Sequence, residues 1–247
     1  MKLLALEQYE SIGVIGLGQT GLSCVRYLLA RDIQPVVFDT RLQPPGVADL
    51  QALAADLEIH TGPLELEHLL AMDLLIVSPG VDLRTPVLQM ARDAAIPVIG
   101  DMDLFAQHAN KPVLGVTGSN GKSTVTRLVA ELLEAAGLQV AMGGNIGVPV
   151  LELVGQPADV FVIELSSFQL ELLHNLHFRA ATILNISDDH LDRYNDSRDY
   201  ANAKHRIYLH TDIAVWNRDQ ETTAPALVPE NQQLTFGLSP THEQGPH

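Results

Sequence analysis

Two segments of this 247-residue sequence share one plan, in which a short apolar run ends in a glycine-rich loop that leads into a helical pattern. Residues 11–23 read SIGVIGLGQTGLS, and residues 113–133 read VLGVTGSNGKSTVTRLVAELL. Glycines at a strand-to-helix turn let the backbone approach a phosphate at the helix N-terminus. The sequence therefore predicts two α/β units, each with a candidate phosphate loop.

Short apolar runs alternate with helical patterns along the whole chain, which favours parallel sheets covered on both faces. We predict a Rossmann-like N-terminal domain over residues 1–100 and a P-loop ATPase-type central domain with a mostly parallel sheet over residues 101–247. The periodic pattern stops after residue 240, so we expect the second sheet to be incomplete. The predicted strands lie at 11–16, 35–39, 58–60, 73–78, 97–100, 112–117, 138–144, 159–166, 180–187 and 212–217.

Composition excludes some classes of protein. The net charge is −15, which argues against a nucleic-acid surface, because such a surface needs a basic stripe. The apolar runs have strand length, and the acidic N-terminus lacks the basic start of a signal peptide, so we expect a cytoplasmic protein with no membrane segment. The single cysteine, Cys24, fits a reducing compartment. No heptad pattern is present, so we expect a monomer.

The first loop carries Gly16, Gly18 and Gly21 in the spacing G-x-G-x-x-G. This spacing is typical of dinucleotide-binding loops, but by itself it does not identify the ligand to which the bound phosphate belongs. Asp39 ends the second predicted strand, where a Rossmann enzyme has its ribose-binding acid. A nicotinamide-dependent oxidoreductase is therefore one alternative.

The second loop has the strand, glycine turn and helix that a P-loop requires. Lys122 would reach the terminal phosphates of ATP, and the Ser123 hydroxyl would ligate magnesium. The loop departs from the usual pattern because Val116 stands where the first glycine is expected. A simple turn before a helix is the alternative. The residues expected to bind ATP are Gly118, Ser119, Asn120, Gly121, Lys122, Ser123 and Thr124.

Five motifs in this order resemble the Mur ligase family: TGSNGKST (117–124), GGNIGVP (143–149), ELSSFQLE (164–171), DDHLDRY (188–194) and AKHRIY (203–208). The segments GLGQTGLSC, FDTR and SPG are similar to the uridine-nucleotide domain of that family. Within it, the chain is most similar to the ligases that add D-glutamate to UDP-N-acetylmuramoyl-L-alanine. The resemblance runs from about residue 11 to residue 236 and implies an ATP-dependent amide ligase of peptidoglycan precursor synthesis.

The resemblance also implies residue roles in the substrate site. The first loop, from Gly16 to Gly21, would hold the diphosphate of the UDP substrate, and Thr40 and Arg41 would flank the uracil. Asn145 and Ser166 would contact the muramoyl part. The full set of expected substrate contacts is Gly18, Gln19, Thr20, Asp39, Thr40, Arg41, Ser78, Gly80, Asn145 and Ser166.

The reaction implied by the resemblance passes through an acyl phosphate, and its expected catalytic residues are Lys122, His190 and Lys204. Ser123 and Glu164 would hold one Mg²⁺. His190 would ligate a second one, with the help of a carbamylated Lys204. Each role has an alternative: Lys204 and Arg206 could form the solvated face of a helix, and His190 could make a local hydrogen bond. Glu164 follows an apolar strand, where an unpaired carboxylate would be costly, so a cation is expected beside it.

Members of this family carry a third, C-terminal domain, and this sequence ends before it. We therefore expect the 247-residue chain to bind the UDP substrate but to turn over poorly or not at all. The alternatives are another ligase of the family, the oxidoreductase and a non-catalytic nucleotide-binding module. Four further histidines have no ligand spacing and are expected at the surface, namely His174, His177, His205 and His210.

Overall fold

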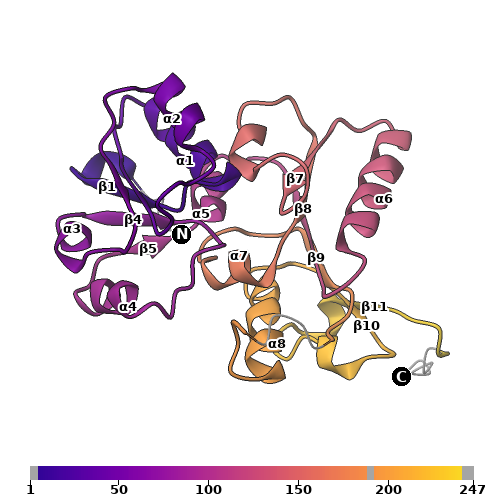
Figure 1. The fold of residues 1–247 in the computed structure, drawn as a ribbon. Helices are drawn as coiled ribbons and strands as arrows, with labels where there is room; N and C mark the ends of the chain where they lie inside the picture. The colour runs from indigo at the N-terminus through magenta and orange to yellow at the C-terminus, as the bar shows by residue number, and fades with distance from the viewer. Residues whose placement is uncertain (1–4, 188–191, 241–247) are drawn as a thin grey trace. The chain divides into compact units, whose positions relative to one another are not determined.

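The computed structural model describes residues 5–187 and 192–240, which form two compact units with one sheet each (Figure 1). The first unit comprises Met1–Asn110, Gly143–Gln156 and Glu171–Leu176, and the second comprises Lys111–Met142, Pro157–Leu170 and His177–His247. The predicted fold class, an α/β protein with Rossmann-like and P-loop-type domains, is confirmed. The domain boundary near residue 100 stays a prediction.

The first sheet has the strand order β3-β2-β1-β4-β5, and all its neighbouring strands pair in parallel. Every residue of β1 and of β4 is buried, as expected for central strands that are covered on both faces. The strands are β1 (Ile12–Ile15), β2 (Val36–Asp39), β3 (Ile59–Thr61), β4 (Leu74–Val77) and β5 (Val98–Ile99). The helical segments up to residue 110 are η1 (Leu6–Gln8), α1 (Gln19–Leu29), α2 (Val47–Leu53), α3 (Leu66–Leu70), α4 (Pro86–Asp93) and α5 (Asp101–Ala106).

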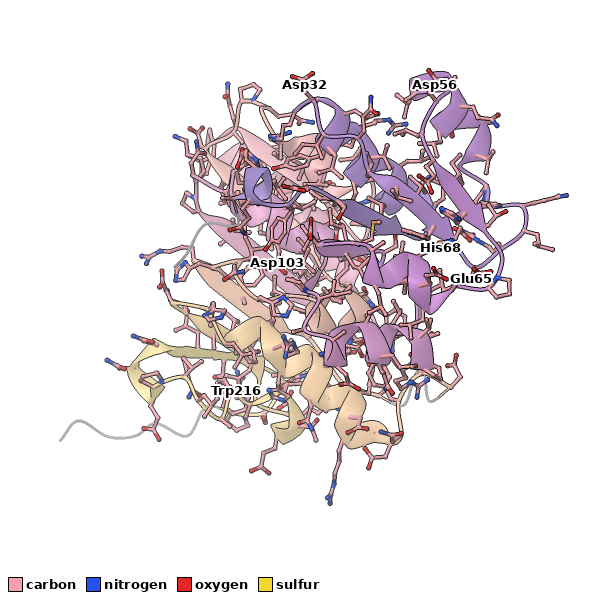
Figure 2. The ribbon with its side chains drawn as sticks, turned by 90° about the vertical axis from the view of Figure 1, so that its left-hand side faces the viewer. Asp32, Asp56, Glu65, His68, Asp103 and Trp216 are labelled. Carbon is pink, nitrogen blue, oxygen red and sulfur yellow. The ribbon has the colours of Figure 1, made fainter. Side chains whose placement is uncertain are left out.

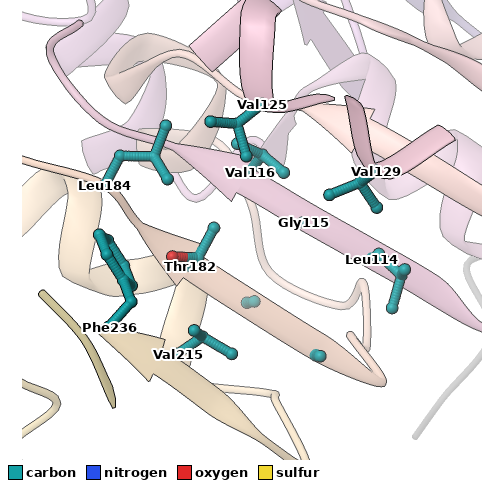
Figure 3. Close-up of a pocket in the computed structure, with 11 residues that line it drawn as sticks. Leu114, Gly115, Val116, Val125, Val129, Thr182, Leu184, Val215 and Phe236 are labelled. Carbon is teal, nitrogen blue, oxygen red and sulfur yellow. The ribbon is translucent and has the colours of Figure 1, made fainter. Parts of the chain in front are cut away.

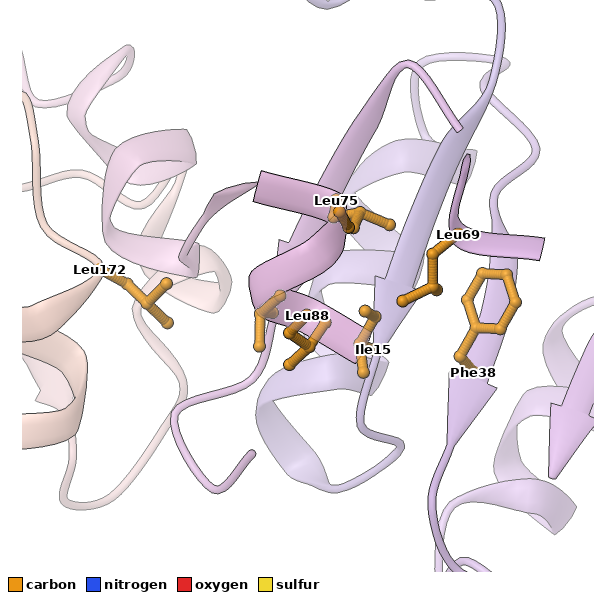
Figure 4. Packing of buried hydrophobic residues seen from close by; sticks show 8 residues of the cluster. Ile15, Phe38, Leu69, Leu75, Leu88 and Leu172 are labelled. Carbon is orange, nitrogen blue, oxygen red and sulfur yellow. The ribbon is translucent and has the colours of Figure 1, made fainter. Parts of the chain in front are cut away.

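The core of the first unit includes a residue from far along the chain. Leu172 packs with Ile15, Phe38, Leu75 and Leu88 in one buried cluster (Figure 4). Asp103 on α5 (Figure 2) fixes the same segment, because its buried carboxylate accepts hydrogen bonds from the N–H groups of His174 and Asn175 at 3.0 and 2.9 Å. The segment after α7 is therefore part of this unit's core.

The second sheet has the strand order β11-β10-β9-β6-β8-β7. Its strands are β6 (Val113–Thr117), β7 (Val140–Gly144), β8 (Val160–Glu164), β9 (Ala180–Ile183), β10 (Ala214–Asn217) and β11 (Gln233–Phe236). The other segments after residue 110 are α6 (Lys122–Ala135), η2 (Val150–Leu153), α7 (Ser167–Glu171), α8 (Ser197–His205), η3 (Arg206–Tyr208), η4 (Glu221–Thr223) and η5 (Glu230–Gln232). The pairing of β11 with β10 adds a parallel strand that the sequence pattern did not predict.

Strand β6 pairs in parallel with β8 on one side and with β9 on the other. The carboxyl ends of these three neighbouring strands therefore meet at one edge of the sheet, where α/β proteins bind ligands. The P-loop follows β6, Glu164 ends β8, and Asn185 lies just beyond β9.

No helix within residues 5–187 and 192–240 combines the length and the apolar character needed to cross a membrane.

Candidate functional site

The first glycine loop has a shape that only small residues allow. Gly16 has φ +95°, and a Cβ on it would lie 2.8 Å from the Cβ of Ser78. A Cβ on Gly21 would lie 1.8 Å from the carbonyl oxygen of Gly16, which is far inside van der Waals contact. By contrast, a Cβ on Gly18 would meet nothing within 4 Å. Gly16 and Gly21 are therefore required by the turn, whereas Gly18 faces open space at the start of α1.

Asp39 anchors this loop from the end of β2. Its carboxylate is 1% exposed and accepts a 2.6 Å hydrogen bond from the N–H of Leu17, in the middle of the loop. The Arg41 guanidinium donates to both carboxylate oxygens, from Nε at 2.8 Å and from Nη2 at 2.6 Å. Burial would raise the pKa of the Asp39 carboxyl, but the hydrogen bonds from Arg41 and Leu17 outweigh it and hold the pKa below its ordinary value. Asp39 thus stays charged and joins the glycine loop to Arg41.

The other residues expected in the UDP site lie around this anchor. Gln19 and Thr20 open α1, whose N-terminus has no side-chain cap. The Ser78 hydroxyl donates a 3.0 Å hydrogen bond to the Gly16 carbonyl and so supports the loop from the end of β4. Thr40 and Gly80 are exposed. The carboxyl ends of β1, β2 and β4 therefore bring this set together at one edge of the first sheet.

In the second glycine loop, two lysines donate hydrogen bonds to the same carbonyl oxygen. Lys122 Nζ donates to the carbonyls of Gly118 and Ser119, both at 3.0 Å. Lys204 Nζ donates to the same Gly118 oxygen at 2.9 Å and lies 4.5 Å from the centre of the Tyr200 ring. Lys204 is only 1% exposed, so the alternative of a solvated helix face is wrong for this residue. The structure thus places both predicted catalytic lysines at the P-loop.

The residues predicted to bind Mg²⁺ are placed only in part. Glu164 is 1% exposed at the end of β8, directly beside Val116 of β6 in register, and Ser123 lies in the first turn of α6. A carboxylate and a hydroxyl are oxygen ligands of the kind that Mg²⁺ prefers, so these two fit the ion. His190 lies outside the described residues. Among the residues that are described, no group of three or more His, Cys, Asp or Glu side chains is arranged to hold a metal.

Ser166 caps the start of α7, and this role can be recognised from the sequence. Its hydroxyl accepts a 3.2 Å hydrogen bond from the N–H of Gln169, while the Gln169 side chain accepts from the N–H of Ser166 at 3.0 Å. This reciprocal pair is a capping box at the start of α7, and the spacing S-x-x-Q in residues 166–169 is its signature. The predicted contact of Ser166 with the muramoyl substrate stays a prediction.

Asn145 lies on a tight turn. The N–H of Gly144 donates to the carbonyl of Val148 at 2.9 Å, and Gly144 and Gly147 have φ +107° and +71°. The turn leaves Asn145 exposed. It belongs to the first unit, whereas Ser166 belongs to the second.

A cavity of about 330 Å³ lies between α6 and the face of strands β6, β9 and β10 (Figure 3). Aliphatic residues and Phe236 line most of it, and Thr182 supplies a hydroxyl. Phosphates need charged or N–H donors, so this cavity is unsuited to the polar groups of ATP. The candidate nucleotide site is the loop at the strand ends.

The four histidines that were expected at the surface are partly or fully exposed. Two of them pair with acids: His174 Nδ1 lies 2.8 Å from Asp103 Oδ2, and His177 Nε2 lies 3.0 Å from Asp212 Oδ1. The sequence analysis did not identify Asn185, whose side-chain carboxamide and backbone carbonyl form hydrogen bonds with the P-loop backbone. No local signal in the sequence marks it, because its partners lie 65 and 66 residues earlier.

Fold and site together define an α/β protein with two glycine loops at the carboxyl ends of two sheets, the second of them a P-loop with lysines around it. Residues 10–100 match the family described as Mur ligase MurD-like, N-terminal domain, and residues 116–244 match the Mur ligase middle domain. The chain therefore belongs to the Mur ligase family.

Curated relatives agree with this assignment. The UDP-N-acetylmuramoylalanine–D-glutamate ligase of Pasteurella multocida is 52% identical over 215 residues, which are 87% of this chain and 49% of the relative. The ligase of the same name from Pectobacterium atrosepticum is 48% identical over 232 residues, which are 94% and 52% of the two chains. The chain thus spans about half the length of the curated relatives it matches.

Solved structures support the fold at lower identity. The UDP-N-acetylmuramate:L-alanyl-gamma-D-glutamyl-meso-diaminopimelate ligase from Neisseria meningitides has a TM-score of 0.55 at 21% identity, over 86% of this chain and 72% of its own. The UDP-N-acetylmuramate-alanine ligase from Thermotoga maritima has a TM-score of 0.54 at 22% identity, over 93% and 53%. Both show that the fold is shared.

Proposed function

We propose that this chain is the UDP-substrate-binding and ATP-binding part of a UDP-N-acetylmuramoyl-L-alanine:D-glutamate ligase (MurD), with Mg²⁺ as its metal ion. The observation that carries the proposal is the P-loop, where Lys122 and the buried Lys204 share the Gly118 carbonyl beside the buried Glu164. The names of relatives at 48% and 52% identity support D-glutamate as the amino acid added. The cytoplasmic location and the monomeric state stay predictions of the sequence.

In the proposed reaction, the carboxylate of UDP-N-acetylmuramoyl-L-alanine attacks the γ-phosphorus of ATP and ADP leaves. The amine of D-glutamate then attacks the acyl phosphate, and the tetrahedral intermediate expels phosphate to leave the amide. Phosphoryl transfer depends mainly on positioning and on neutralising charge. Lys122 would turn from its carbonyl acceptors to the β- and γ-phosphates, while the N–H groups at the start of α6 would bind phosphate oxygens.

Glu164 and Ser123 would hold Mg²⁺, which when bound supplies positive charge against the phosphate oxygens. Lys122 Nζ and Lys204 Nζ both donate to the Gly118 carbonyl oxygen, at 3.0 and 2.9 Å. The proposed carbamylation of Lys204 would therefore place an anionic oxygen ligand at the P-loop, close to Lys122. Mass spectrometry of the intact chain with and without bicarbonate would test this modification.

On the first unit, the glycine loop and the N-terminus of α1 would bind the diphosphate, and Arg41 would lie against the uracil. The oxidoreductase alternative had Asp39 as its only support. Because the Asp39 carboxylate already accepts from Leu17 and Arg41, it is a poor acceptor for ribose hydroxyls. Because both Asp39 carboxylate oxygens already accept hydrogen bonds within the protein, a UDP ligand is favoured over NAD at this loop.

Calorimetric titration of the chain tests the proposal, with UDP-N-acetylmuramoyl-L-alanine and ATP as ligands and NAD as the control. We expect both proposed ligands to bind and NAD not to bind. UDP-N-acetylmuramate, which lacks the L-alanine, separates this ligase from the family member that adds L-alanine, and we expect it to bind more weakly. Binding of NAD without binding of the UDP compound would overturn the proposal.

A further inference from the structure

The short segment that follows β9, residues 184–187, is held by groups from three other parts of the second unit. The N–H of Leu184 donates to the Thr117 carbonyl at 2.9 Å, at the end of β6. The N–H of Ser187 donates to the Ser119 hydroxyl oxygen at 3.0 Å. On the other side, the Gln220 carboxamide accepts from the N–H of Ile186 at 2.9 Å and donates to its carbonyl at 2.5 Å. The segment is therefore fixed between the P-loop and the turn after β10.

Asn185 links this segment to the P-loop with three hydrogen bonds. Its side-chain Oδ1 accepts from the N–H of Asn120 at 2.8 Å, and its Nδ2 donates to the Asn120 carbonyl at 3.0 Å. Its own carbonyl accepts from the N–H of Ser119 at 2.9 Å. One residue thus fixes two consecutive residues at the tip of the loop.

The two-point contact with Asn120 requires a carboxamide of this length. Alanine has neither the donor nor the acceptor, and aspartate keeps the acceptor but loses the donor. Gln220 makes the same kind of two-point contact with Ile186. Gln220 therefore holds the 184–187 segment, and Asn185 in that segment holds the P-loop.

These contacts decide which loop donors remain for a phosphate. The N–H groups of Ser119 and Asn120 are directed at Asn185, so the loop cannot use them as long as it keeps this shape. Within residues 5–187 and 192–240, the N–H groups of the next four residues, 121–124, donate no hydrogen bond. Gly121, with φ +79°, forms the turn between the two sets of donors.

We propose that Asn185 is a positioning residue for the P-loop. It holds the backbone at Ser119 and Asn120, so that the donors at the start of α6 and Lys122 face the phosphates of the nucleotide. Gln220 supports it from the opposite side of the 184–187 segment. The inference rests on the proposed function only in taking ATP as the nucleotide.

The experiment compares Asn185→Ala and Gln220→Ala with the matched control Asn231→Ala, which removes an exposed carboxamide of the same unit. ATP binding and UDP-N-acetylmuramoyl-L-alanine binding are measured by calorimetry. Hydrogen exchange of the Ser119 and Asn120 amides is measured by NMR. The amide exchange rates report on the P-loop itself. The affinity for the UDP ligand shows whether the first unit remains folded.

We expect Asn185→Ala to weaken ATP binding about 10-fold, since two hydrogen bonds that fix the loop are lost. Exchange at Asn120 should accelerate, while UDP-ligand binding stays unchanged. Gln220→Ala acts through the intermediate segment, so we expect a smaller loss of about threefold. The control should match the wild type in every measurement.

Unchanged ATP binding with a protected Asn120 amide in Asn185→Ala would overturn the inference. An equal loss of both ligands in Asn185→Ala would indicate general unfolding of that variant, and Gln220→Ala then decides by the same criteria. If the wild type binds no ATP, the proposed function fails, and unaltered amide exchange in the variants would then reject the positioning role separately.

Discussion

The two glycine loops share the plan of strand, loop and helix, yet the groups that hold them carry opposite charges. The first loop is held by an anion, the Asp39 carboxylate, which accepts the N–H of Leu17. The second loop is held by cations, because Lys122 and Lys204 donate to the Gly118 carbonyl. A phosphate at the first loop would depend on backbone N–H groups, whereas a phosphate at the second loop would also meet the ammonium group of Lys122. Similar backbone motifs thus give sites with different electrostatics.

The largest expected effect is on ATP binding. Replacing Lys122 with alanine removes a cation from the second loop, and we expect ATP affinity to fall roughly 100-fold, as for a strong charge-assisted hydrogen bond. UDP-ligand affinity should not change. Calorimetry measures both, with Lys111→Ala as the control, because Lys111 is an exposed lysine just before the other end of β6. A similar loss for both variants would mean that net charge, not the loop, attracts ATP.

The next effect separates backbone geometry from charge in the first loop. Gly21→Ala would place a Cβ 1.8 Å from the Gly16 carbonyl oxygen, so the turn must shift. We expect a loss of about 3 kcal/mol in the free energy of unfolding. Gly18→Ala is the matched control, since nothing lies within 4 Å of its Cβ and its φ is −97°. Thermal unfolding followed by circular dichroism compares them, and equal stability of the two variants would contradict the packing argument.

A smaller effect tests Arg41 as the residue that lies against the uracil. Arg41→Ala should weaken binding of the UDP ligand about 10-fold and leave ATP binding unchanged, because a half-exposed charge contributes modestly. Arg84→Ala provides the control, since Arg84 pairs with Asp82 two residues earlier, as Arg41 pairs with Asp39. If Arg84→Ala has the larger effect, the uracil end of the ligand lies elsewhere.

The smallest effect concerns the helix behind the first loop. Burial, together with the nearby Arg31, lowers the pKa of His108, whose Nε2 lies 2.7 Å from the Tyr27 hydroxyl. The folded state therefore favours the neutral ring, so stability that is present above pH 6.5 is lost as the pH falls through the lowered pKa.

Between pH 8 and pH 5, the unfolding temperature of the wild type should fall roughly 2 °C more than that of His108→Gln. Differential scanning calorimetry at the two pH values measures this difference. A larger fall in the variant would contradict the sign of the shift.

Most of the fold could be predicted from the alternation of apolar runs and helical patterns. Every predicted strand is present, because a parallel strand that is buried on both faces, such as β4, has a continuous apolar signature. The pattern failed for β11, where two of four residues are polar and three are exposed. It also could not show that Leu172 packs with Ile15, since an apolar residue carries no information on which core it joins.

The candidate site was predictable where its chemistry is local in sequence. The loop glycines, Lys122 and Ser123 lie within two short motifs, so spacing was enough to find them. Asn185 and the burial of Lys204 depend on contacts between segments that are 65 and 86 residues apart. The capping box at Ser166 is visible in the sequence as S-x-x-Q, whereas the contact of Ser166 with the substrate follows only from the family resemblance and stays a prediction.

The assignment of Gly143–Gln156 and Glu171–Leu176 to the first unit has a practical consequence for anyone who wants to divide this protein. Expression of residues 1–110 alone would remove Leu172 from the apolar cluster, Glu152 from its 2.9 Å ion pair with Arg26, and the His174 and Asn175 amides from Asp103. Such a fragment would expose apolar surface and leave a buried carboxylate without its donors. The first unit is therefore not a contiguous piece of sequence, and a soluble version of it would need the two later segments spliced back or replaced by designed caps.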